Sequence, residues 1–295
     1  MSTDPSARRF VSYIDKSRAY YAAQGYGSPY RWARPADRPA LSRLLRPLST
    51  LRVGLVTSAF PLPPSGEDVP VEVPYATPIE PLPTGLFTAD DNRDRSAAPA
   101  NERESYLPLA RLQELAAAGR IGELGPRFYG APYDYSQRRT TEQDAPAVAA
   151  FLRADGVQAA VLVPHCPVCH QSLSLVARHL EAAGIPTVLI GSARDIVEEI
   201  GVPRFLFVDF PLGYPTGKPG DAEQQRSICA QALDLLESAT APRTTVHADA
   251  EWGDDAWRTE YMKVDESTAG TLAAAGDARR TDQERARVEG RTRQS

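Results

Sequence analysis

The sequence predicts an α/β protein: a Rossmann-like parallel sheet with helices on both of its faces. From residue 145 onward, short apolar runs alternate with helical patterns, and glycine and proline mark the joints between them. Such alternation predicts parallel strands joined by right-handed crossovers. The run 159–163 is apolar throughout, as in a strand covered on both faces. A turn with two cysteines follows it, so we expect a strand–turn–helix unit that carries a C-x-x-C motif at the C-terminal edge of the sheet, where open α/β sheets bind ligands.

Composition excludes several classes of protein. The 295 residues are 42% apolar, so the chain can bury a core, and its net charge of −5 argues against a general nucleic-acid binder. No apolar run approaches the ~18 residues of a membrane span, and the first residues contain no apolar signal region. We therefore expect a cytoplasmic protein that binds neither nucleic acid nor membrane. Three cysteines do not suggest a disulfide scaffold, and Cys229, within a helical pattern, is expected to be a buried structural thiol.

The chain divides into four parts: an aromatic, partly helical N-terminal segment at 1–50, an α/β domain at 51–240, an extension at 241–264 and a tail at 265–295. Apolar periodicity predicts helices at 10–24, 38–48, 107–118, 145–154, 171–183, 193–200 and 221–238. Apolar runs predict strands at 51–58, 158–163, 186–190 and 204–209. Asp144 is expected to cap the helix that follows it. The tail is charged and lacks apolar periodicity, so we expect it to be disordered.

A long irregular insertion at 60–105 interrupts the α/β domain. It is rich in proline and then acidic, and connections of this length are usually functional or mobile loops. Asp90, Asp91 and Asp94 could bind a cation there, although a solvated acidic loop explains them more simply.

Cys166 and Cys169 are the residues with the clearest chemistry. Two thiols at this spacing can close a disulfide, and the N-terminus of a helix can lower a cysteine pKa from ~8.5 to between ~3.5 and ~7.5. We expect Cys166 to lie at the mouth of the crevice and to attack, and Cys169 to resolve the adduct.

His165 and His170 bracket the cysteine pair and could move protons to and from the thiols. Together with Cys166 and Cys169 they could instead hold Zn or Cu. Against a metal site, four ligands in one tight turn rarely reach one tetrahedral ion, and no second C-x-x-C or H-x-x-x-H motif exists to complete it.

Polar and glycine residues follow other strands at the same edge. We expect Thr57, Ser58, Asp209, Gly213 and Gly217 to contact substrate, although Thr and Ser also serve as ordinary caps. The loop 210–220 superficially resembles a phosphate loop, but its glycine spacing is one residue short and a proline follows the lysine. Nucleotide hydrolysis is therefore excluded.

Several segments together resemble one family. They are RLQELAAAGRIGEL at 111–124, the buried strand followed by CPVC, EAAGIPTVLIG at 181–191, and FVDFPLGYPTGKPGD at 207–221. In this order they resemble the B subunits of glycine, sarcosine and betaine reductases and of D-proline reductase, the selenoprotein B family, over about residues 50–240. In that family a selenocysteine or cysteine is followed three residues later by cysteine; here cysteine occupies the first position.

The resemblance implies a thiol-dependent oxidoreductase that reduces or reductively cleaves a small polar, amino-acid-like metabolite. Cys166 would be the nucleophile and Cys169 its resolving partner, with electrons from a thioredoxin-like donor or a low-molecular-weight thiol. Known members act with a pyruvoyl-containing subunit, so a partner subunit is implied, and we also expect a homo-oligomer. Two alternatives stay open: a Zn- or Cu-binding protein that uses the HCPVCH cluster, and a non-catalytic subunit that keeps the fold.

Overall fold

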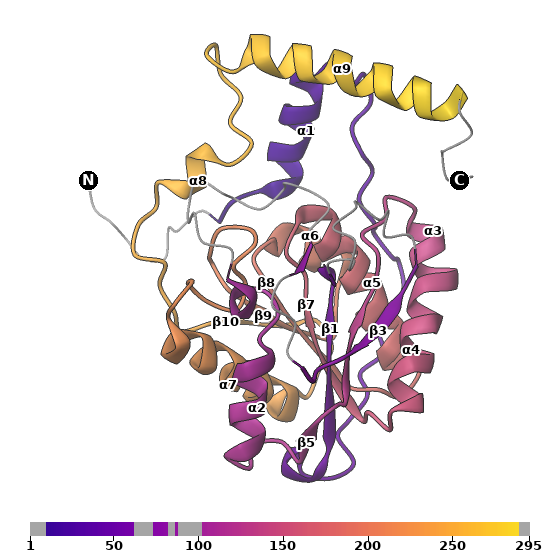
Figure 1. Ribbon diagram of the computed structural model, residues 1–295, viewed down its shortest axis with the longest axis vertical. Coiled ribbons are helices and arrows are strands. Elements are labelled where there is room, and N and C mark those ends of the chain that lie inside the picture. Colours follow the sequence, from indigo (N-terminus) through magenta and orange to yellow (C-terminus); the bar gives the residue numbers. More distant parts are fainter. Residues whose placement is uncertain (1–9, 62–72, 82–85, 88–101, 289–295) are drawn as a thin grey trace.

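The computed structural model describes residues 10–61, 73–81, 86–87 and 102–288 (Figure 1). Asp90, Asp91 and Asp94 of the predicted acidic loop lie outside these residues. The described strands are β1 (Arg52–Thr57), β2 (Phe60–Pro61), β3 (Tyr75–Pro78), β4 (Leu86–Phe87), β5 (Glu123–Leu124), β6 (Arg127–Gly130), β7 (Ala159–Val163), β8 (Thr187–Gly191), β9 (Arg204–Phe207) and β10 (Thr244–His247). Eight of them form one sheet, and β2 and β4 pair separately.

The strand order of the main sheet is β10-β9-β8-β7-β1-β6-β3, with β5 pairing with the start of β1. All neighbours are parallel except β3, which runs antiparallel along the edge of β6. Numbered along the chain, with β5 and β6 in one position beside β1, the parallel strands follow the doubly wound order 2-1-3-4-5-6. This is the flavodoxin-type order, whose switch point lies between the first and third strands. In this chain those strands are β1 and β7.

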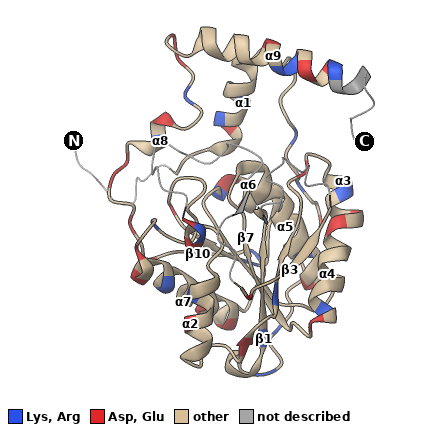
Figure 2. Ribbon diagram, viewed as in Figure 1, with Lys and Arg blue, Asp and Glu red and all other residues tan. Residues whose placement is uncertain are grey.

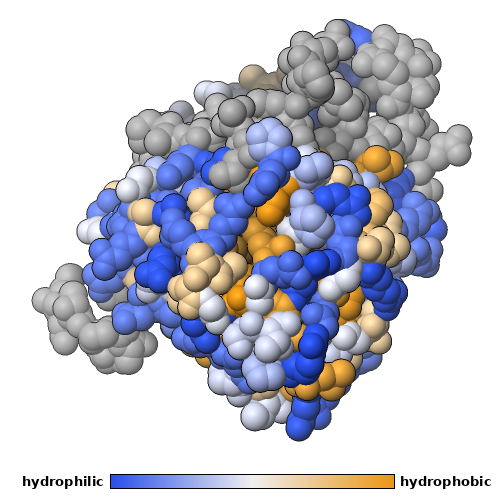
Figure 3. Space-filling view, turned by 60° about the horizontal axis from the view of Figure 1, so that its bottom comes forward, coloured by the Kyte–Doolittle hydropathy of each residue, from blue (hydrophilic) through white to orange (hydrophobic). Residues whose placement is uncertain are grey.

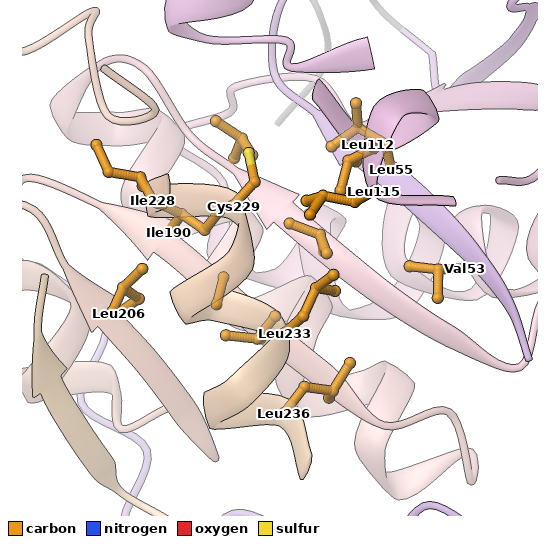
Figure 4. Packing of buried hydrophobic residues seen from close by; sticks show 14 of the residues in the cluster. Val53, Leu55, Leu112, Leu115, Ile190, Leu206, Ile228, Cys229, Leu233 and Leu236 are labelled. Atoms are coloured by element: carbon orange, nitrogen blue, oxygen red, sulfur yellow. The ribbon is translucent and has the colours of Figure 1, made fainter. Parts of the chain in front are cut away.

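Helices cover both faces of the sheet, as the sequence predicted. The principal ones are α2 (Leu109–Ala117), α4 (Ala145–Ala154), α5 (Pro167–Ala182), α6 (Arg194–Ile200) and α7 (Ala222–Ser238). Buried residues of α2 and α7 pack on one face, where Figure 4 shows Leu112 and Leu233 among the strand side chains. Those of α4, α5 and α6 pack on the other face.

Strand β7 shows why its sequence is apolar throughout. Val161 and Val163 join the cluster under α2 and α7, whereas Ala160 and Leu162 join the cluster under α4 and α5. Successive side chains of a strand point to opposite faces, so a strand with helices on both sides has no polar position. Every residue of β7 is buried.

Four strands of the sheet were not predicted: β3, β5, β6 and β10. β5 and β6 are short and lie among glycines, in a stretch that reads as a loop. β10 is a half-exposed edge strand without an apolar run, so the sheet extends into the predicted C-terminal extension. β3 lies in the predicted irregular insertion.

The helix predicted at 38–48 is absent; only Leu48–Thr50 forms a short 3-10 turn. Pro39 and Pro47 lack the N–H that a helix needs. Side chains of the body also bind the segment directly, because the Ser42 N–H donates to Glu181 at 2.5 Å and the Ser42 carbonyl accepts from Arg204 at 2.7 Å.

Two helix starts differ from the prediction. Asp144 does not cap α4, because α3 (Gln137–Arg139) and a π-helical turn run directly into it. The cap is Ser136, whose hydroxyl accepts from the N–H of Arg139. α5 begins four residues earlier than predicted, so the C-x-x-C motif forms its N-cap and first turn.

The two ends of the described chain pack together. Helix α1 (Tyr13–Ala23) is fixed to α6 by Asp195, which accepts the Ile14 N–H at 2.8 Å. Within the tail predicted to be disordered, Ala269–Val288 forms α9, which crosses the end of α1 (Figure 1), whereas residues 289–295 lie outside the described residues. Arg280 of α9 donates to the Gln24 carbonyl at 2.6 Å, and charged residues crowd the C-terminal half of α9 (Figure 2).

The face seen in Figure 3 is mostly hydrophilic around a small central patch of apolar residues. No helix among the described residues is both long enough and apolar enough to cross a membrane.

Candidate functional site

The candidate site lies at the switch point between β1 and β7. Ser58 directly follows the last residue of β1, and His165 lies two residues after the last residue of β7. Their side chains meet, with Ser58 Oγ 2.9 Å from His165 Nδ1, and both are buried. β1 and β7 are neighbouring parallel strands, so both end at the same edge of the sheet. Two residues that are 107 positions apart in the sequence therefore meet there.

Cys166 is the N-cap residue of α5, and Pro167 occupies the first turn. The Sγ of Cys166 accepts the N–H of Cys169 at 3.1 Å, as an oxygen does in an ordinary N-cap. The two cysteines form a disulfide, with a Cα–Cα distance of 4.9 Å. After reduction, the free N–H groups and the dipole of the helix would favour a thiolate at Cys166.

His165 stands between Ser58 and the second cysteine. Its Nε2 lies 4.0 Å from Cys169 Sγ, while Nδ1 faces the Ser58 hydroxyl. The ring of Tyr106 lies against it, with the ring centroids 6.2 Å apart. The serine hydroxyl orients the imidazole, and the Nε2 edge of the imidazole faces the sulfur of Cys169.

His170 has a different environment. Its Nδ1 lies 2.7 Å from the Cys166 carbonyl, and its Nε2 accepts the N–H groups of Ser192 and Ala193 at 3.0 and 3.2 Å. This pattern requires a neutral ring with the proton on Nδ1. Burial lowers the pKa of His170 to about 4. Both ring nitrogens bind backbone groups, so His170 ties the start of α5 to the loop after β8 and has no nitrogen left for the sulfurs.

The stability of the protein should therefore fall in mild acid. In the unfolded chain a histidine binds a proton below its usual pKa of ~6.5, but folded His170 does so only at about 4. Between these values the unfolded state binds more protons, so it gains about 2 kcal/mol relative to the folded state at pH 5. Urea unfolding at pH 7 and pH 5 measures this loss. A His170→Gln variant should be less stable at pH 7, and its free energy of unfolding should fall less between pH 7 and pH 5 than that of the wild type. An equal fall in the variant would show that other groups cause the acid sensitivity.

Cys166 is more deeply buried than the sequence predicted. Cys166 was expected at the mouth of the crevice, but Cys166 and Cys169 are both 0% exposed. Trp32 and Tyr133 pack against the buried cluster that these cysteines form with Val168. Trp32 belongs to the aromatic loop that follows α1, outside the α/β domain, and a strand–turn–helix motif alone does not reveal this contact.

The predicted substrate-binding residues do not all meet at this site. Thr57 is buried and its hydroxyl accepts the N–H of Ala59, as an ordinary cap does. Asp209 forms a two-bond ion pair with Arg258 of α8 (Trp257–Glu260), at 2.7 and 2.8 Å. Ser58, in contrast, contacts His165 directly.

The loop that contains Gly213 and Gly217 is connected to the site through the segment from Glu104 to Tyr106. Both glycines have positive φ, and a Cβ on Gly217 would lie 2.7 Å from the Gln225 side chain. Thr216 donates from its hydroxyl to the Glu104 carbonyl at 2.7 Å. The segment after Glu104 leads to Tyr106, the residue against His165. The loop thus supports the residues around the site.

Three aromatic residues of the site were not among the predicted site residues: Trp32, Tyr106 and Tyr133. The aromatic content of residues 25–35 indicated a loop packed on the body, but no sequence pattern indicated its contact with the cysteines. Among the described residues, no group of three or more His, Cys, Asp or Glu side chains is placed to hold a metal ion.

The fold and the site define a doubly wound α/β protein with a buried cysteine pair at its switch point. Comparison with curated proteins finds relatives in amino-acid reductases. D-proline reductase subunit gamma of Acetoanaerobium sticklandii is 33% identical over 133 residues, which are 44% of this chain and 54% of the relative. Glycine reductase complex component B subunit gamma of Carboxydothermus hydrogenoformans is 27% identical over 222 residues, 70% of this chain and 50% of the relative.

Sarcosine reductase complex component B subunit beta of Peptoclostridium acidaminophilum is 23% identical over 220 residues, 70% of this chain and 50% of the relative. These homologues confirm the resemblance to the reductase B-subunit family. The chain spans about half the length of the curated relatives it matches. No family model matches the chain, and no solved structure gives a significant match.

Proposed function

We propose that this protein is a thiol-dependent subunit of a reductase complex, and that Cys166 and Cys169 cycle between dithiol and disulfide while a small metabolite is reduced or reductively cleaved. The observation that carries the proposal is the position of the pair: Cys166 caps α5, and Cys169 faces His165. The relatives support it, because all three are subunits of amino-acid reductases.

The two sulfurs have different surroundings, which supports different roles. The Cys166 thiolate, stabilised at the helix N-terminus, attacks the electrophilic atom of the substrate. The bond from that atom to its leaving group breaks with its electron pair, and the leaving group takes a proton. His165 takes the proton of Cys169, and the Cys169 thiolate attacks the Cys166 sulfur. The disulfide forms, the bond from Cys166 to the substrate atom breaks with its electron pair, and the released product takes a proton. A thioredoxin-like protein or a low-molecular-weight thiol restores the dithiol.

Within this proposal, His165 and Ser58 form the proton-transfer unit and His170 has a positioning role, because both nitrogens of His170 bind backbone groups. The chain covers about half of its relatives, and the relatives are subunits of larger complexes. We therefore propose that turnover requires a partner subunit that helps to hold the substrate. A homo-oligomer stays an expectation.

The second candidate is a non-catalytic subunit that keeps the fold. One observation favours it: both sulfurs are 0% exposed under Trp32 and Tyr133, so a substrate reaches them only after this cover moves. The two candidates differ in whether reduced Cys166 is ionised and reactive near neutral pH.

A titration of the reduced thiols tests the proposal. In a Cys169→Ser variant, the Cys166 thiolate should form with a pKa below the ~8.5 of a free cysteine, because the helix N-terminus stabilises the anion. The ultraviolet absorbance of the thiolate, followed against pH, measures this and does not depend on access to reagents. Cys229 should not interfere, since burial raises its pKa far above the usual value. A Cys166 pKa at or above that of a free cysteine would favour the non-catalytic subunit.

A further inference from the structure

A cavity of about 140 Å³ lies beside the cysteine motif. Its lining includes Pro167 and Val168, the two residues between the cysteines, together with residues of α1 and of the loop after α1. Trp32 lines the cavity and also packs against the buried cluster of Cys166, Val168 and Cys169. The same indole therefore borders the cavity and packs against the cluster that contains the disulfide.

The walls of this cavity are mainly aromatic and apolar. They include Ile14, Tyr21, Tyr30, Trp32, Val168 and Met262, which define what we call the aromatic cavity. The Tyr30 ring packs edge-on against Trp32 and against Tyr135, each with centroids 5.1 Å apart. Edge-to-face packing is the favoured arrangement of aromatic pairs, so another ring would find complementary surfaces here.

The walls are held in place before any ligand arrives. Gln171 of α5 donates from Nε2 to the Tyr30 hydroxyl at 2.6 Å, and its Oε1 accepts the Ala33 N–H at 3.0 Å. It thereby fixes the chain on both sides of Trp32. The Tyr30 hydroxyl in turn donates to the Tyr135 carbonyl at 2.9 Å. A wall that is already ordered loses little conformational entropy when a ligand binds.

The volume fits one aromatic ring, because an apolar cavity of ~150 Å³ is known to hold a benzene molecule. We infer that the aromatic cavity binds an aromatic group of a small-molecule substrate, and that the rest of that molecule reaches Cys166, which is buried and does not line the cavity, once the indole of Trp32 turns aside. This inference rests on the proposed function and extends it, because it names the class of substrate.

The charges around the cavity decide which aromatic group fits. Arg18 lines it, and the guanidinium groups of Arg279 and Arg280 lie over the rings of Tyr21 and Tyr26, at 5.8 and 5.6 Å from the centroids. These tyrosine faces are thus already occupied by cations. Arg18 and Arg280 are paired with Asp15 and Asp277, so they add little net charge. A cationic ligand cannot stack on ring faces that arginines already cover, so the group bound is a neutral aromatic one.

Three thiol reagents test the inference on the reduced Cys169→Ser chain: methyl, benzyl and 2-(trimethylammonio)ethyl methanethiosulfonate. In each case the Cys166 thiolate attacks the sulfenyl sulfur, methanesulfinate leaves and a mixed disulfide forms, which intact mass measures over time. Each rate is divided by the rate of the methyl reagent, and the ratio is compared with the same ratio for free glutathione. The benzyl-to-methyl ratio should be about tenfold higher for Cys166 than for glutathione, whereas the ratio of the cationic to the methyl reagent should be no higher.

Two alanines of α1 provide matched variants. Both alanines are exposed, and Ala22 is among the residues that line the cavity, whereas Ala19, three residues earlier, is not. Ala22→Phe should bring the benzyl-to-methyl ratio close to that of glutathione, and Ala19→Phe should keep the wild-type ratio; melting temperatures check the folding of both. If the reagents react at glutathione-like ratios, or if Ala22→Phe has no effect, this inference is overturned, whereas the proposed function of Cys166 as a reactive thiol is retained. If none of the reagents modifies Cys166, the proposed function fails as well.

Discussion

A reduced Cys169→Ser variant should accumulate a stable glutathione adduct on Cys166 when it is mixed with glutathione disulfide. In the wild type the Cys166 thiolate attacks the reagent, one glutathione leaves, and Cys169 then displaces the second glutathione by closing the disulfide seen in the structure. Without Cys169 the second displacement cannot occur. Intact mass should show the adduct as the main species of the variant and only the oxidised chain for the wild type.

The reciprocal Cys166→Ser variant should react roughly tenfold more slowly or not at all, because Cys169 is not the N-cap of α5 and lacks the same stabilisation as a thiolate. His165→Ala, with both cysteines present, should slow closure of the disulfide while the first attack is kept, since His165 Nε2 faces Cys169. Cys229→Ala is the control and should behave as the wild type. Faster reaction of Cys169 than of Cys166 would reverse the assignment of roles.

Replacement of Glu181 by alanine should destabilise the protein by about 3–5 kcal/mol, the usual cost of leaving one charge of a buried ion pair alone. Glu181 and Arg204 pair at 2.7 Å with side chains 0% and 1% exposed. Glu181 also accepts the N–H of Thr187 at 2.6 Å and that of Ser42. Urea unfolding at neutral pH gives the change in the free energy of unfolding.

The double replacement Glu181→Leu with Arg204→Met should recover much of the loss. Burial raises the pKa of Glu181 and lowers the pKa of Arg204, so each charge carries a desolvation cost that an apolar pair would avoid. Arg120→Ala, which removes an exposed pair with Asp234, is the control and should change stability by about 1 kcal/mol or less. If Glu181→Ala costs no more than this control, the buried pair does not stabilise the fold.

The sequence alone determined the parallel α/β class, the run of elements from 145 to 238 and the position of the cysteine pair after a buried strand. These features follow from local patterns. A strand between two helical layers must be apolar throughout, as in Ala159–Val163, and a covered helix must repeat its apolar residues at helical spacing, as in α5 and α7. Weak or half-exposed elements such as β10 lack such a pattern and were missed.

Only the tertiary structure decided the roles of residues that look equivalent in the sequence. His165 and His170 both flank the cysteines, yet one faces Ser58 and Cys169 while the other binds three backbone groups. The cover by Trp32 likewise comes from a segment more than a hundred residues away. Local pattern reports whether a residue is apolar and on which face it lies. It does not report which distant segment packs there, because that depends on the strand order and on how the N-terminal segment closes over the sheet edge.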